Sequence, residues 1–527
     1  MKRFNGIALS VAFCSLASQA ALAQTKIDTL KVQNLNEVIV KGVRATKEAP
    51  YAVANIRKSE LKQFSCSGQE LPFLLSRTPG ILAWSENGIG TGTTYMRIRG
   101  AAGSRINVTL DGVALNSPED QTVFWANMNS YSSLLGSIQV QRGVGSSTNG
   151  DGAFGGSISM ATAAPSLTPT AEVTGSFGSY NTYHTGASFS TGLLGKHLIF
   201  DGAYHETATD GYVDGTSGRS GSYYGGLTWL GDNFKVSYKN IGNFEKTGQA
   251  WNGVLGGDYN SNFTLLDDGI RTYKDMYKAG LDKFNVLTGD LVRNDKGDYT
   301  ITPYTLRDGS KWDKTTDNFY QNHNILSATW TPGSHWSHSL SLHYTYGYGY
   351  YKEFKNNAKF AKFGLVYKDA EGNKVKKSDF IRKKGLTQHT YCMVYNTNYK
   401  DEHWDVIGGL NLQQFRGNHW GYLTYIANQD AEKKFFGSNG KYKYYDSDAH
   451  KYDYSAFVKA SYRFADYWNA FADLQYRRVE YKTDGINDKF IAQADGSYKN
   501  QELNINEKYN FFNPKASTRM ATRHTHL

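Results

Sequence analysis

The sequence contains few cysteines, few prolines and no long apolar segment after its first residues. Its 527 residues include 3 Cys and 9 Pro. Cys66 and Cys392 lie far apart, and no CxxC or Cys/His metal spacing is present. Neither a disulfide framework nor a metal site is therefore expected. Beyond residue 23 no run of about eighteen apolar residues occurs, so we expect no transmembrane helix.

Sequence motifs for catalysis are also missing. There is no HExxH and no GxSxG, and the 13 histidines are scattered along the chain. The glycine-rich segment Gly143–Gly152 lacks the lysine of a phosphate-binding loop. Tight turns explain these glycines better. We therefore expect a protein that is not an enzyme and that uses no cofactor.

The N-terminus has the pattern of a secretory signal peptide. The charged residues Lys2 and Arg3 precede the mostly apolar stretch Ile7–Ala17, and an A-x-A cleavage site ends at Ala23. A lipoprotein signal at Cys14 is the alternative, but the preceding phenylalanine is too large for that position. The pattern predicts a secreted chain.

Aromatic residues and glycine are abundant, and they occur in alternating strands. The chain has 38 Tyr, 27 Phe, 10 Trp and 54 Gly. From about residue 170 onward, apolar and polar residues alternate, as in Ser337–Tyr348, Tyr454–Phe464 and Asn469–Arg477. A membrane barrel with an apolar outside and a wet inside explains this period. A soluble β-sandwich has the same period and is the alternative.

The lengths of the connections separate these two architectures. Short connections are expected near residues 193–195, 231–232, 332–335, 401–403 and 466–468. Long connections are expected at Thr207–Ser220, Phe244–Asn318, Tyr351–Gly385, Gly417–His450 and Thr483–Glu507. Short periplasmic turns that alternate with long extracellular loops are typical of an outer-membrane barrel. We count about twelve strands, including an edge strand near Asn506–Phe512.

The block Thr94–Thr162 contains short strands separated by glycine turns. We predict them at Tyr95–Arg99, Ile106–Leu110, Ser137–Gln141 and Ser157–Ala161. Four motifs occur there in order: RIRG (Arg97–Gly100), RINVTLDGVALN (Arg105–Asn116), VFWANM (Val123–Met128) and QRGVGSSTNGDGAFGGSI (Gln141–Ile158). The block resembles the plug domain of the TonB-dependent receptors of bacterial outer membranes, in particular those of the Bacteroidota. The resemblance implies a mostly β fold, an antiparallel transmembrane β-barrel with a small α/β plug domain in its lumen.

The resemblance continues to about Lys515 and then stops. Plugged transporters have roughly 22 strands, and the last residues here neither alternate nor end in an aromatic residue. An open sheet edge in lipid would leave unpaired backbone groups. We therefore expect a receptor cut short near its midpoint, with a natural small barrel as the alternative. The expected domains are a signal peptide 1–23, a periplasmic leader 24–48, a plug 49–165, the N-terminal half of a barrel 166–515 and an aberrant tail 516–527.

Three sets of site residues are predicted. The extended segment Leu35, Asn36, Glu37, Val38, Ile39 and Val40 resembles the TonB box, which can add as a strand to a partner's sheet; a first plug strand is the alternative. Charge-assisted bonds to barrel carboxylates are expected from Arg97, Arg99, Arg105 and Arg142, which are otherwise ordinary surface arginines. Substrate contacts are expected from the polar loop residues Glu86, Asn87, Glu119, Asp120, Gln121, Trp125, Trp251 and Asn252, which are otherwise turn residues.

The resemblance implies TonB-dependent import of a scarce substrate across the outer membrane of a Gram-negative cell. A ferric siderophore or related iron complex is the expected substrate, with cobalamin or small glycans as alternatives. Three further hypotheses are an inactive truncated fragment, a passive porin or adhesin, and an outer-membrane barrel enzyme such as a protease or lipase. The last of these needs a catalytic constellation near the barrel rim, and none is evident in the sequence. The expected partners are TonB with its inner-membrane energising complex, and outer-membrane lipid and lipopolysaccharide. Nucleic acid is not expected despite a net charge of +10, and the chain is expected to be a monomer.

Overall fold

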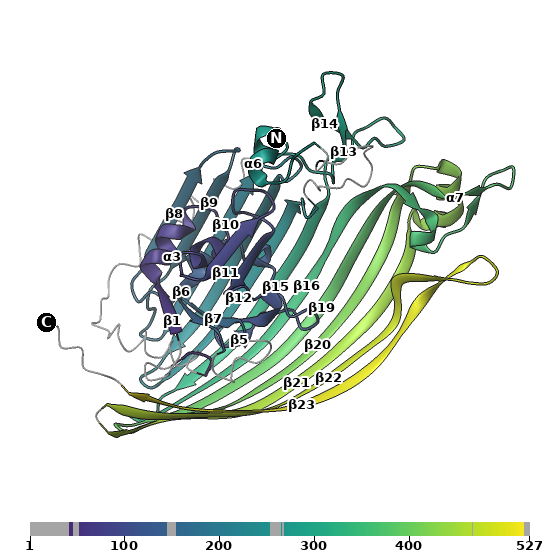
Figure 1. The fold of residues 1–527 in the computed structure, drawn as a ribbon. Helices are drawn as coiled ribbons and strands as arrows, with labels where there is room; N and C mark the ends of the chain where they lie inside the picture. Colours follow the sequence, from purple (N-terminus) through teal and green to yellow (C-terminus); the bar gives the residue numbers. More distant parts are fainter. Residues whose placement is uncertain are drawn as a thin grey trace.

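In the computed structural model, a small mixed domain lies against one face of a long, curved antiparallel sheet (Figure 1). The structure describes residues 42–45, 52–144, 154–252, 265, 268–465 and 467–520. Among these residues no helix is long and apolar enough to cross a membrane. The predicted signal peptide and the segment Leu35–Val40 lie outside the described residues.

The smaller domain, called the plug below, is built on a five-stranded sheet. Its strand order is β1-β6-β7-β4-β5, with β4 parallel to β7 and the other neighbours antiparallel. A separate hairpin joins β2 to β3. The plug elements are β1 (Ala52–Arg57), α3 (Lys58–Ser65), α4 (Leu71–Leu75), β2 (Ile81–Ser85), β3 (Thr94–Ile98), η1 (Gly103–Arg105), β4 (Ile106–Leu110), β5 (Val113–Ala114), η2 (Trp125–Met128), α5 (Tyr131–Leu134), β6 (Leu135–Arg142) and β7 (Gly156–Thr162). The four predicted plug strands correspond to β3, β4, β6 and β7.

The plug has an apolar core of its own. Met96 and Ile98 alternate with exposed residues along β3, so they point to the interior. Leu110 of β4 and Ile138 of β6 are fully buried in the same cluster, which also includes helix α4. Pro72 lies in the first turn of α4, where the missing backbone N–H is not needed by the helix.

The larger sheet, called the wall below, has twelve strands in antiparallel order, which confirms the predicted count. Its order follows the sequence from β8 at one edge to β23 at the other. The strands are β8 (Thr170–Phe177), β9 (Tyr183–Ser190), β10 (Leu198–Thr209), β11 (Gly218–Leu230), β12 (Phe234–Gly248), β15 (Thr316–Trp330), β16 (Trp336–Lys359), β19 (Lys377–Lys400), β20 (Trp404–Ile426), β21 (Tyr442–Ala465), β22 (Trp468–Ala492) and β23 (Tyr498–Met520).

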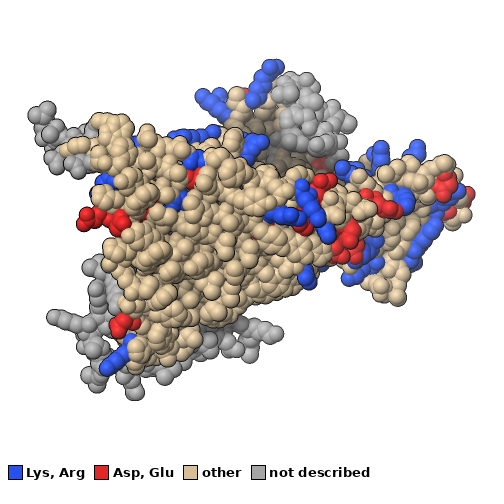
Figure 2. All heavy atoms as spheres, turned by 90° about the horizontal axis from the view of Figure 1, so that it is seen from below, with Lys and Arg blue, Asp and Glu red and all other residues tan. Residues whose placement is uncertain are grey.

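The buried face of the wall is polar and its exposed face is apolar. In β16, Ser339, Ser341 and His343 are at most 5% exposed, whereas Leu340 and Leu342 are 37% and 44% exposed. We call the face that meets the plug the inner face. On the surface seen in Figure 2, a wide area lacks charged side chains, and charges gather toward the end where Figure 1 shows α7. This polarity suits a sheet with lipid outside and polar groups inside.

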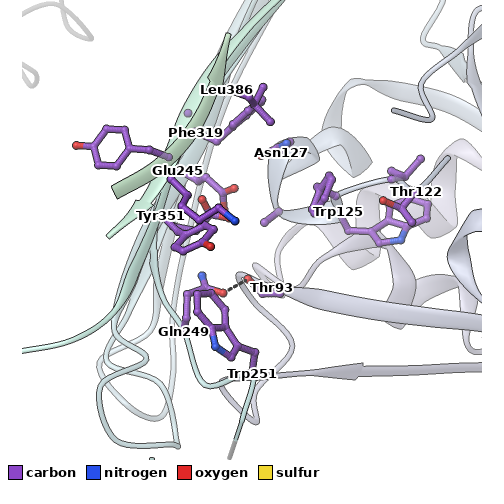
Figure 3. A pocket seen from close by; sticks show the side chains of 18 of the residues that line it. Thr93, Thr122, Trp125, Asn127, Glu245, Gln249, Trp251, Phe319, Tyr351 and Leu386 are labelled. Atoms are coloured by element: carbon purple, nitrogen blue, oxygen red, sulfur yellow. Dashed lines mark hydrogen bonds between the residues drawn. The ribbon is translucent and has the colours of Figure 1, made fainter. Parts of the chain in front are cut away.

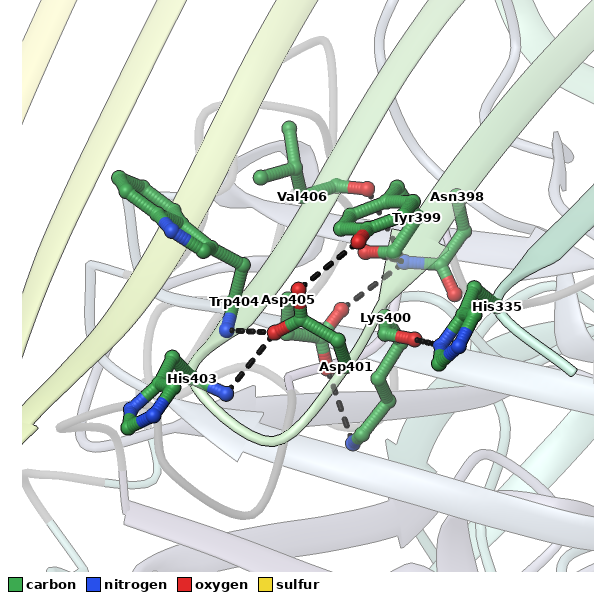
Figure 4. A network of polar contacts seen from close by, with 9 residues as sticks. All are labelled: His335, Asn398, Tyr399, Lys400, Asp401, His403, Trp404, Asp405 and Val406. Atoms are coloured by element: carbon green, nitrogen blue, oxygen red, sulfur yellow. Dashed lines mark hydrogen bonds and ion pairs between the residues drawn. The ribbon is translucent and has the colours of Figure 1, made fainter.

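The connections at one end of the wall are short, as predicted. Between β19 and β20, one Asp401 carboxylate oxygen accepts the backbone N–H groups of His403 and Trp404 at 2.8 and 2.7 Å (Figure 4). The Tyr399 hydroxyl donates to the other Asp401 oxygen at 2.8 Å. The backbone bond from Trp404, together with the other two, lowers the pKa of Asp401. An ionised aspartate therefore holds this turn.

At the opposite end, the connections are shorter than the sequence predicted. They comprise residues 210–217, 249–315, 360–376, 427–441 and 493–497. These connections hold α6 (Tyr273–Lys278), β13 (Gly289–Arg293), β14 (Tyr299–Pro303), η4 (Phe360–Phe363), β17 (Tyr367–Lys368), β18 (Lys374–Val375), α7 (Gln429–Phe436) and η5 (Gly437–Asn439). At β16, β19, β20 and β21 the predicted boundaries were wrong because an apolar cluster that includes Phe363, Phe380 and Leu423 packs on the ends of these strands.

The last strand also extends beyond its predicted end. β23 continues past Lys515 and pairs with β22 as far as Met520, opposite Trp468. Residues 516–520, expected to belong to an irregular tail, are therefore part of the sheet. Backbone hydrogen bonds join the two strands whether or not the side chains alternate. The two cysteines outside the N-terminal region are free, with Cys66 exposed and Cys392 buried.

The plug core provides a direct test of this packing. Leu110→Ala should destabilise the plug by about 2–5 kcal/mol because it removes a fully buried side chain and leaves a cavity. Leu82→Ala is the matched control, since Leu82 is 61% exposed, and it should cost under about 0.5 kcal/mol. Urea-dependent protease cleavage of the full chain in detergent measures both. Equal shifts for the two variants would contradict the described core.

Candidate functional site: the cavity between plug and wall

A buried ion pair joins the plug to the inner face of the wall. The Lys239 ammonium of β12 donates to Asp111 at 2.6 Å and also to the Thr162 hydroxyl. Asp111 follows β4 and accepts the backbone N–H of Thr162 at 2.9 Å. Burial acts to raise the pKa of Asp111, but the charge and hydrogen bond of Lys239 and the bonds from Thr162 outweigh it and lower that pKa. Both charged side chains are under 10% exposed.

A plug loop at residues 117–122 makes a second set of contacts with the wall. Glu119 accepts hydrogen bonds from His419 Nε2 at 2.6 Å and from the Tyr481 hydroxyl at 3.0 Å. Lys451 of β21 donates to the Pro118 carbonyl at 3.0 Å. Three neighbouring strands of the wall, β20, β21 and β22, therefore contact this loop.

A cavity of about 740 Å³ lies between the plug and the wall, toward the end with the long connections. Its plug side includes Trp125 and Asn127, and its wall side includes Glu245 and Tyr351 (Figure 3). At one end of the cavity the Thr93 hydroxyl donates to Gln249 at 3.0 Å, so the plug touches the loop that follows β12. The cavity volume suits a small organic ligand or chelate.

The cations of the cavity are paired with carboxylates. Lys384 donates to Asp488 at 2.7 Å, and His419 is bound to Glu119. These pairs lie on β19, β20 and β22 and on the plug loop. This side of the cavity is therefore close to neutral.

Carboxylates collect on the other side of the cavity. Glu245 of β12 and Asp317 of β15 line it, and Glu86 of the plug accepts hydrogen bonds from the Tyr95 hydroxyl at 2.6 Å and the Ala250 backbone N–H at 2.7 Å. Burial raises the pKa of Tyr95, and the negative charges of Glu86 and Asp317 raise it further. Burial also raises the pKa of Glu86.

Glu70 is a further buried carboxyl group, and it lies in the plug. Burial raises the pKa of Glu70 to about 8, although a hydrogen bond from Asn129 lowers it. Glu70 lies close enough to Glu245 for the two groups to interact electrostatically. Within the described ranges, no group of three or more His, Cys, Asp or Glu side chains is placed to hold a metal ion.

The structure brings some of the predicted substrate residues to cavities. Trp125 and Trp251 line the large cavity, and the Trp251 ring meets Tyr351 edge to face at 5.5 Å. Glu119 and Asp120 line a neighbouring cavity of about 240 Å³. Both cavities include Phe124, Asn127 and His419 on their walls, so they adjoin each other.

The other predicted substrate residues occupy turns or flank the cavity. The buried Asn87 side chain bonds to Ser85 and Thr91 within its own loop. Gln121 has a left-handed backbone with φ of 61° and donates to the Pro118 carbonyl. Asn252 is exposed. Neither Gln121 nor Asn252 is among the residues that line the two cavities described above.

The contacts described for the plug arginines lie within the plug. Arg97 donates to the Gly100 carbonyl at 3.3 Å, and Arg142 to the Pro79 carbonyl at 3.0 Å. Arg99 has a left-handed backbone, and its N–H donates to the Gly80 carbonyl. Arg105 is exposed. The anchoring role of these arginines stays a prediction. The predicted anchors place the cation on the plug and the carboxylate on the wall, whereas the observed buried pair has Lys239 on the wall and Asp111 on the plug.

Sequence reasoning missed Lys239, Asp111, Glu245 and Asp317. A lysine on the polar face of an alternating strand, and an aspartate inside the LDG sequence of the plug, were the available signals for the ion pair. Glu245 and Asp317 flank the longest connection, and both fell within or beside a segment expected to be a loop. Only the observed extent of β12 and β15 places them together.

The plug lies against the polar face of the wall, with a cavity between them. Residues 45–157 match the family model described as the TonB-dependent receptor plug domain. No curated protein sequence matches the chain. The family match covers most of the plug and ends within β7.

Solved structures of low sequence identity share the fold. The ferric yersiniabactin uptake receptor FyuA from Yersinia pestis is 12% identical with a TM-score of 0.60, over 92% of this chain and 64% of that protein. The ferric-catecholate import receptor Fiu from E. coli K12 is 12% identical with a TM-score of 0.63, over 91% and 69%. The copper transporter OprC is 10% identical with a TM-score of 0.60, over 91% and 64%.

Residues 45–157 therefore match a TonB-dependent receptor plug domain, and the chain shares its fold with the two receptors and the transporter named above. The chain spans 64% of the length of the yersiniabactin receptor to which it is similar. The plug and the wall of strands are therefore both present in the segment that the structure describes.

The buried ion pair predicts a large effect of one substitution. Lys239→Met should destabilise the plug against the wall by about 3–5 kcal/mol, because it leaves Asp111 buried without its cation. Lys239→Met/Asp111→Leu should recover much of this loss. Lys62→Met is the control, since the plug–wall pair of Lys62 with Glu172 is exposed and is worth at most about 1 kcal/mol. Urea-dependent protease cleavage in detergent measures the series.

The pH dependence of this pair has a defined sign. The folded state lowers the pKa of Asp111, so its stabilisation is present above the unfolded pKa of about 4. It is lost as the pH falls through the lowered pKa of the folded state. Plug stability that is equal in the wild type and Lys239→Met at neutral pH would contradict the pair.

Proposed function

We propose that the chain acts in TonB-dependent import of a scarce small substrate across the outer membrane. The observation that carries this proposal is the cavity of about 740 Å³ at the end with long connections, bounded on one side by the plug and on the other by the wall. A ligand that enters from that end reaches the plug directly. Passage to the other end requires the plug to shift or to unfold in part.

An iron complex is the proposed substrate. Two of the similar structures are named as receptors for ferric complexes, one for ferric yersiniabactin and one for ferric catecholates. A third is named as a copper transporter, so a metal complex is the chemistry these names share. The cavity volume supports a chelate of the size of a small organic molecule.

The proposed substrate contacts begin with the aromatic residues Trp125 and Trp251, since both line the cavity. Glu119 and Asp120 line the adjoining cavity, and Glu119 also fastens the plug loop to the wall. A ligand that displaces His419 from Glu119 would loosen this loop. Substrate binding would in this way weaken one attachment of the plug.

The proposed partner on the other side of the membrane is TonB. The segment Leu35–Val40 precedes the plug, and its alternating β-branched residues support strand addition to a partner's sheet. Lipid and lipopolysaccharide are the proposed surroundings of the apolar outer face. Leu340 and Leu342 on that face support contact with hydrocarbon.

One substitution separates import from binding. Val38→Pro should reduce the energised accumulation of radiolabelled iron, supplied as ferric catecholate or ferric citrate, to the level of cells without TonB. Proline removes a backbone donor and cannot extend a central ladder. Binding of the same complex to de-energised cells should stay unchanged, because the described residues that line the cavity do not include Val38.

The matched control is Lys26→Pro, which places proline in the same leader but outside the proposed box. This variant should accumulate iron like the wild type at equal surface abundance. Accumulation by Val38→Pro at the wild-type rate would contradict the assignment of the box. Accumulation that does not depend on TonB in any variant would contradict import by this mechanism.

A further inference from the structure

Two carboxylates on the wall side of the cavity have no basic partner among the contacts described. Glu245 is 7% exposed, and the hydrogen bond described for its side chain comes from the Thr247 hydroxyl at 3.4 Å. Asp317 lines the same cavity. Lys384 and His419, the cations that line it, are already bound to Asp488 and Glu119. Within the described residues, these two carboxyl groups therefore have no free cation beside them.

The strand register places these two carboxylates together on the inner face. Thr247 pairs with Asp317, and Glu245 pairs with Phe319, across β12 and β15. Glu245 and Asp317 are thus diagonal neighbours, about 7–8 Å apart along the two strands. Glu86 adds a third carboxylate from the plug side, since its charge and that of Asp317 both act on Tyr95.

An independent polar group on the plug points to a ligand at this place. Asn127 is 9% exposed, and its side-chain oxygen has no hydrogen-bond partner. It lines the cavity on the side opposite Glu245 (Figure 3). A buried amide oxygen without a partner costs free energy, and a bound N–H donor would satisfy it. The carboxylate oxygens of Glu245 and Asp317 would also accept hydrogen bonds from N–H groups of the same ligand.

Aromatic rings surround these acceptors. Trp125 comes from the plug, Trp251 from the loop after β12, and Phe319 and Tyr351 from the wall. Aromatic faces beside carboxylates favour an organic cation, because the ring quadrupole attracts positive charge and excludes water around it. The same rings bind the apolar part of a ligand.

We propose that the substrate of this cavity carries a positively charged nitrogen, an ammonium or guanidinium group, that binds between Glu245, Asp317 and Asn127. This inference rests on the proposed function, since it names the chemical class of the imported substrate. A metal chelate that bears an amine would fit both the proposed import of a metal complex and the carboxyl groups of this cavity. Its cationic arm would lie against the carboxyl groups, and its remaining part would lie between Trp125 and Trp251. A purely anionic chelate would place its negative charge against these two carboxyl groups and gain no hydrogen-bond donor for them.

The test compares three probes that share a phenylethyl group and differ in charge, on the purified full chain in detergent: 2-phenylethylammonium, neutral 2-phenylethanol and anionic 3-phenylpropanoate. Binding is followed by quenching of tryptophan fluorescence. The ammonium probe should bind about tenfold or more tightly than the alcohol, and the carboxylate more weakly than either. Glu245→Gln and Asp317→Asn should each remove most of this preference while leaving the affinity for the alcohol within about twofold.

Glu480→Gln is the matched control. Glu480 lies on β22 and pairs with Arg478, and this variant should keep the full preference. Equal affinity of the wild type for the ammonium and the alcohol would overturn the proposal. So would an unchanged preference in both Glu245→Gln and Asp317→Asn, or displacement of the ammonium probe by calcium alone at equal concentration, which would make the site one for a metal ion.

The outcome is separable from that of the proposed function. Probe selectivity in detergent does not need TonB, whereas energised accumulation in cells does. If accumulation depends on TonB but the cavity does not prefer the ammonium probe, the proposal of a cationic substrate is wrong and the proposal of TonB-dependent import is kept. If the cavity prefers the ammonium probe but accumulation does not depend on TonB, the proposal of import is wrong and the proposed binding site for a cation is kept.

Discussion

The structure depends on one constraint: the inner face of the wall is polar, and it is buried. Lysine, histidine, serine and asparagine side chains cover this face, and each must find a partner when water is removed. The plug supplies partners, as Asp111 does for Lys239 and as the Tyr131 hydroxyl does for Asn243 at 2.8 Å. A plug with an apolar surface could not occupy this place, because the polar groups of the wall would lose their hydrogen bonds.

The cavity forms where this fit is incomplete. Toward the end with long connections, aromatic side chains keep the two surfaces apart, and Trp125 and Tyr351 line the space between them. The polar groups left there are not all matched by the protein, as the unpaired oxygen of Asn127 shows. Polar groups that the plug leaves without partners are available to a ligand. Polar groups that lack a protein partner lower the stability of the fold, and the same groups can form hydrogen bonds with a ligand.

Much of the fold was predictable from local sequence patterns. Alternation over two residues predicted the wall strands, and glycine turns in the block Thr94–Thr162 predicted β3, β4, β6 and β7, because both signals are local. The ends of the wall strands were not predictable. Phe363 and Phe380 pack in a cluster formed from separate connections, and such contacts between distant segments leave no periodic signal in either one.

The candidate site was predictable in part. Trp125 and Trp251 were found because an aromatic residue in a polar loop is a local signal. Glu245 and Asp317 were missed because their proximity depends on the register of β12 with β15 across the longest connection. The plug arginines show the reverse case. Their motif is local, but the contacts described for Arg97 and Arg142 stay inside the plug, since the partner of a side chain depends on the docked arrangement.

The central claim is that the plug rests against the wall and must move for a substrate to pass. A tether tests it most directly. A β-carbon placed on Gly92 of the plug would lie 3.6 Å from that of Thr247 on the wall, within the range of a disulfide. Gly92→Cys/Thr247→Cys, in a Cys66→Ser background, should lose energised iron accumulation when oxidised, keep surface binding, and regain accumulation on reduction. Full accumulation by the oxidised, cross-linked protein would contradict the account.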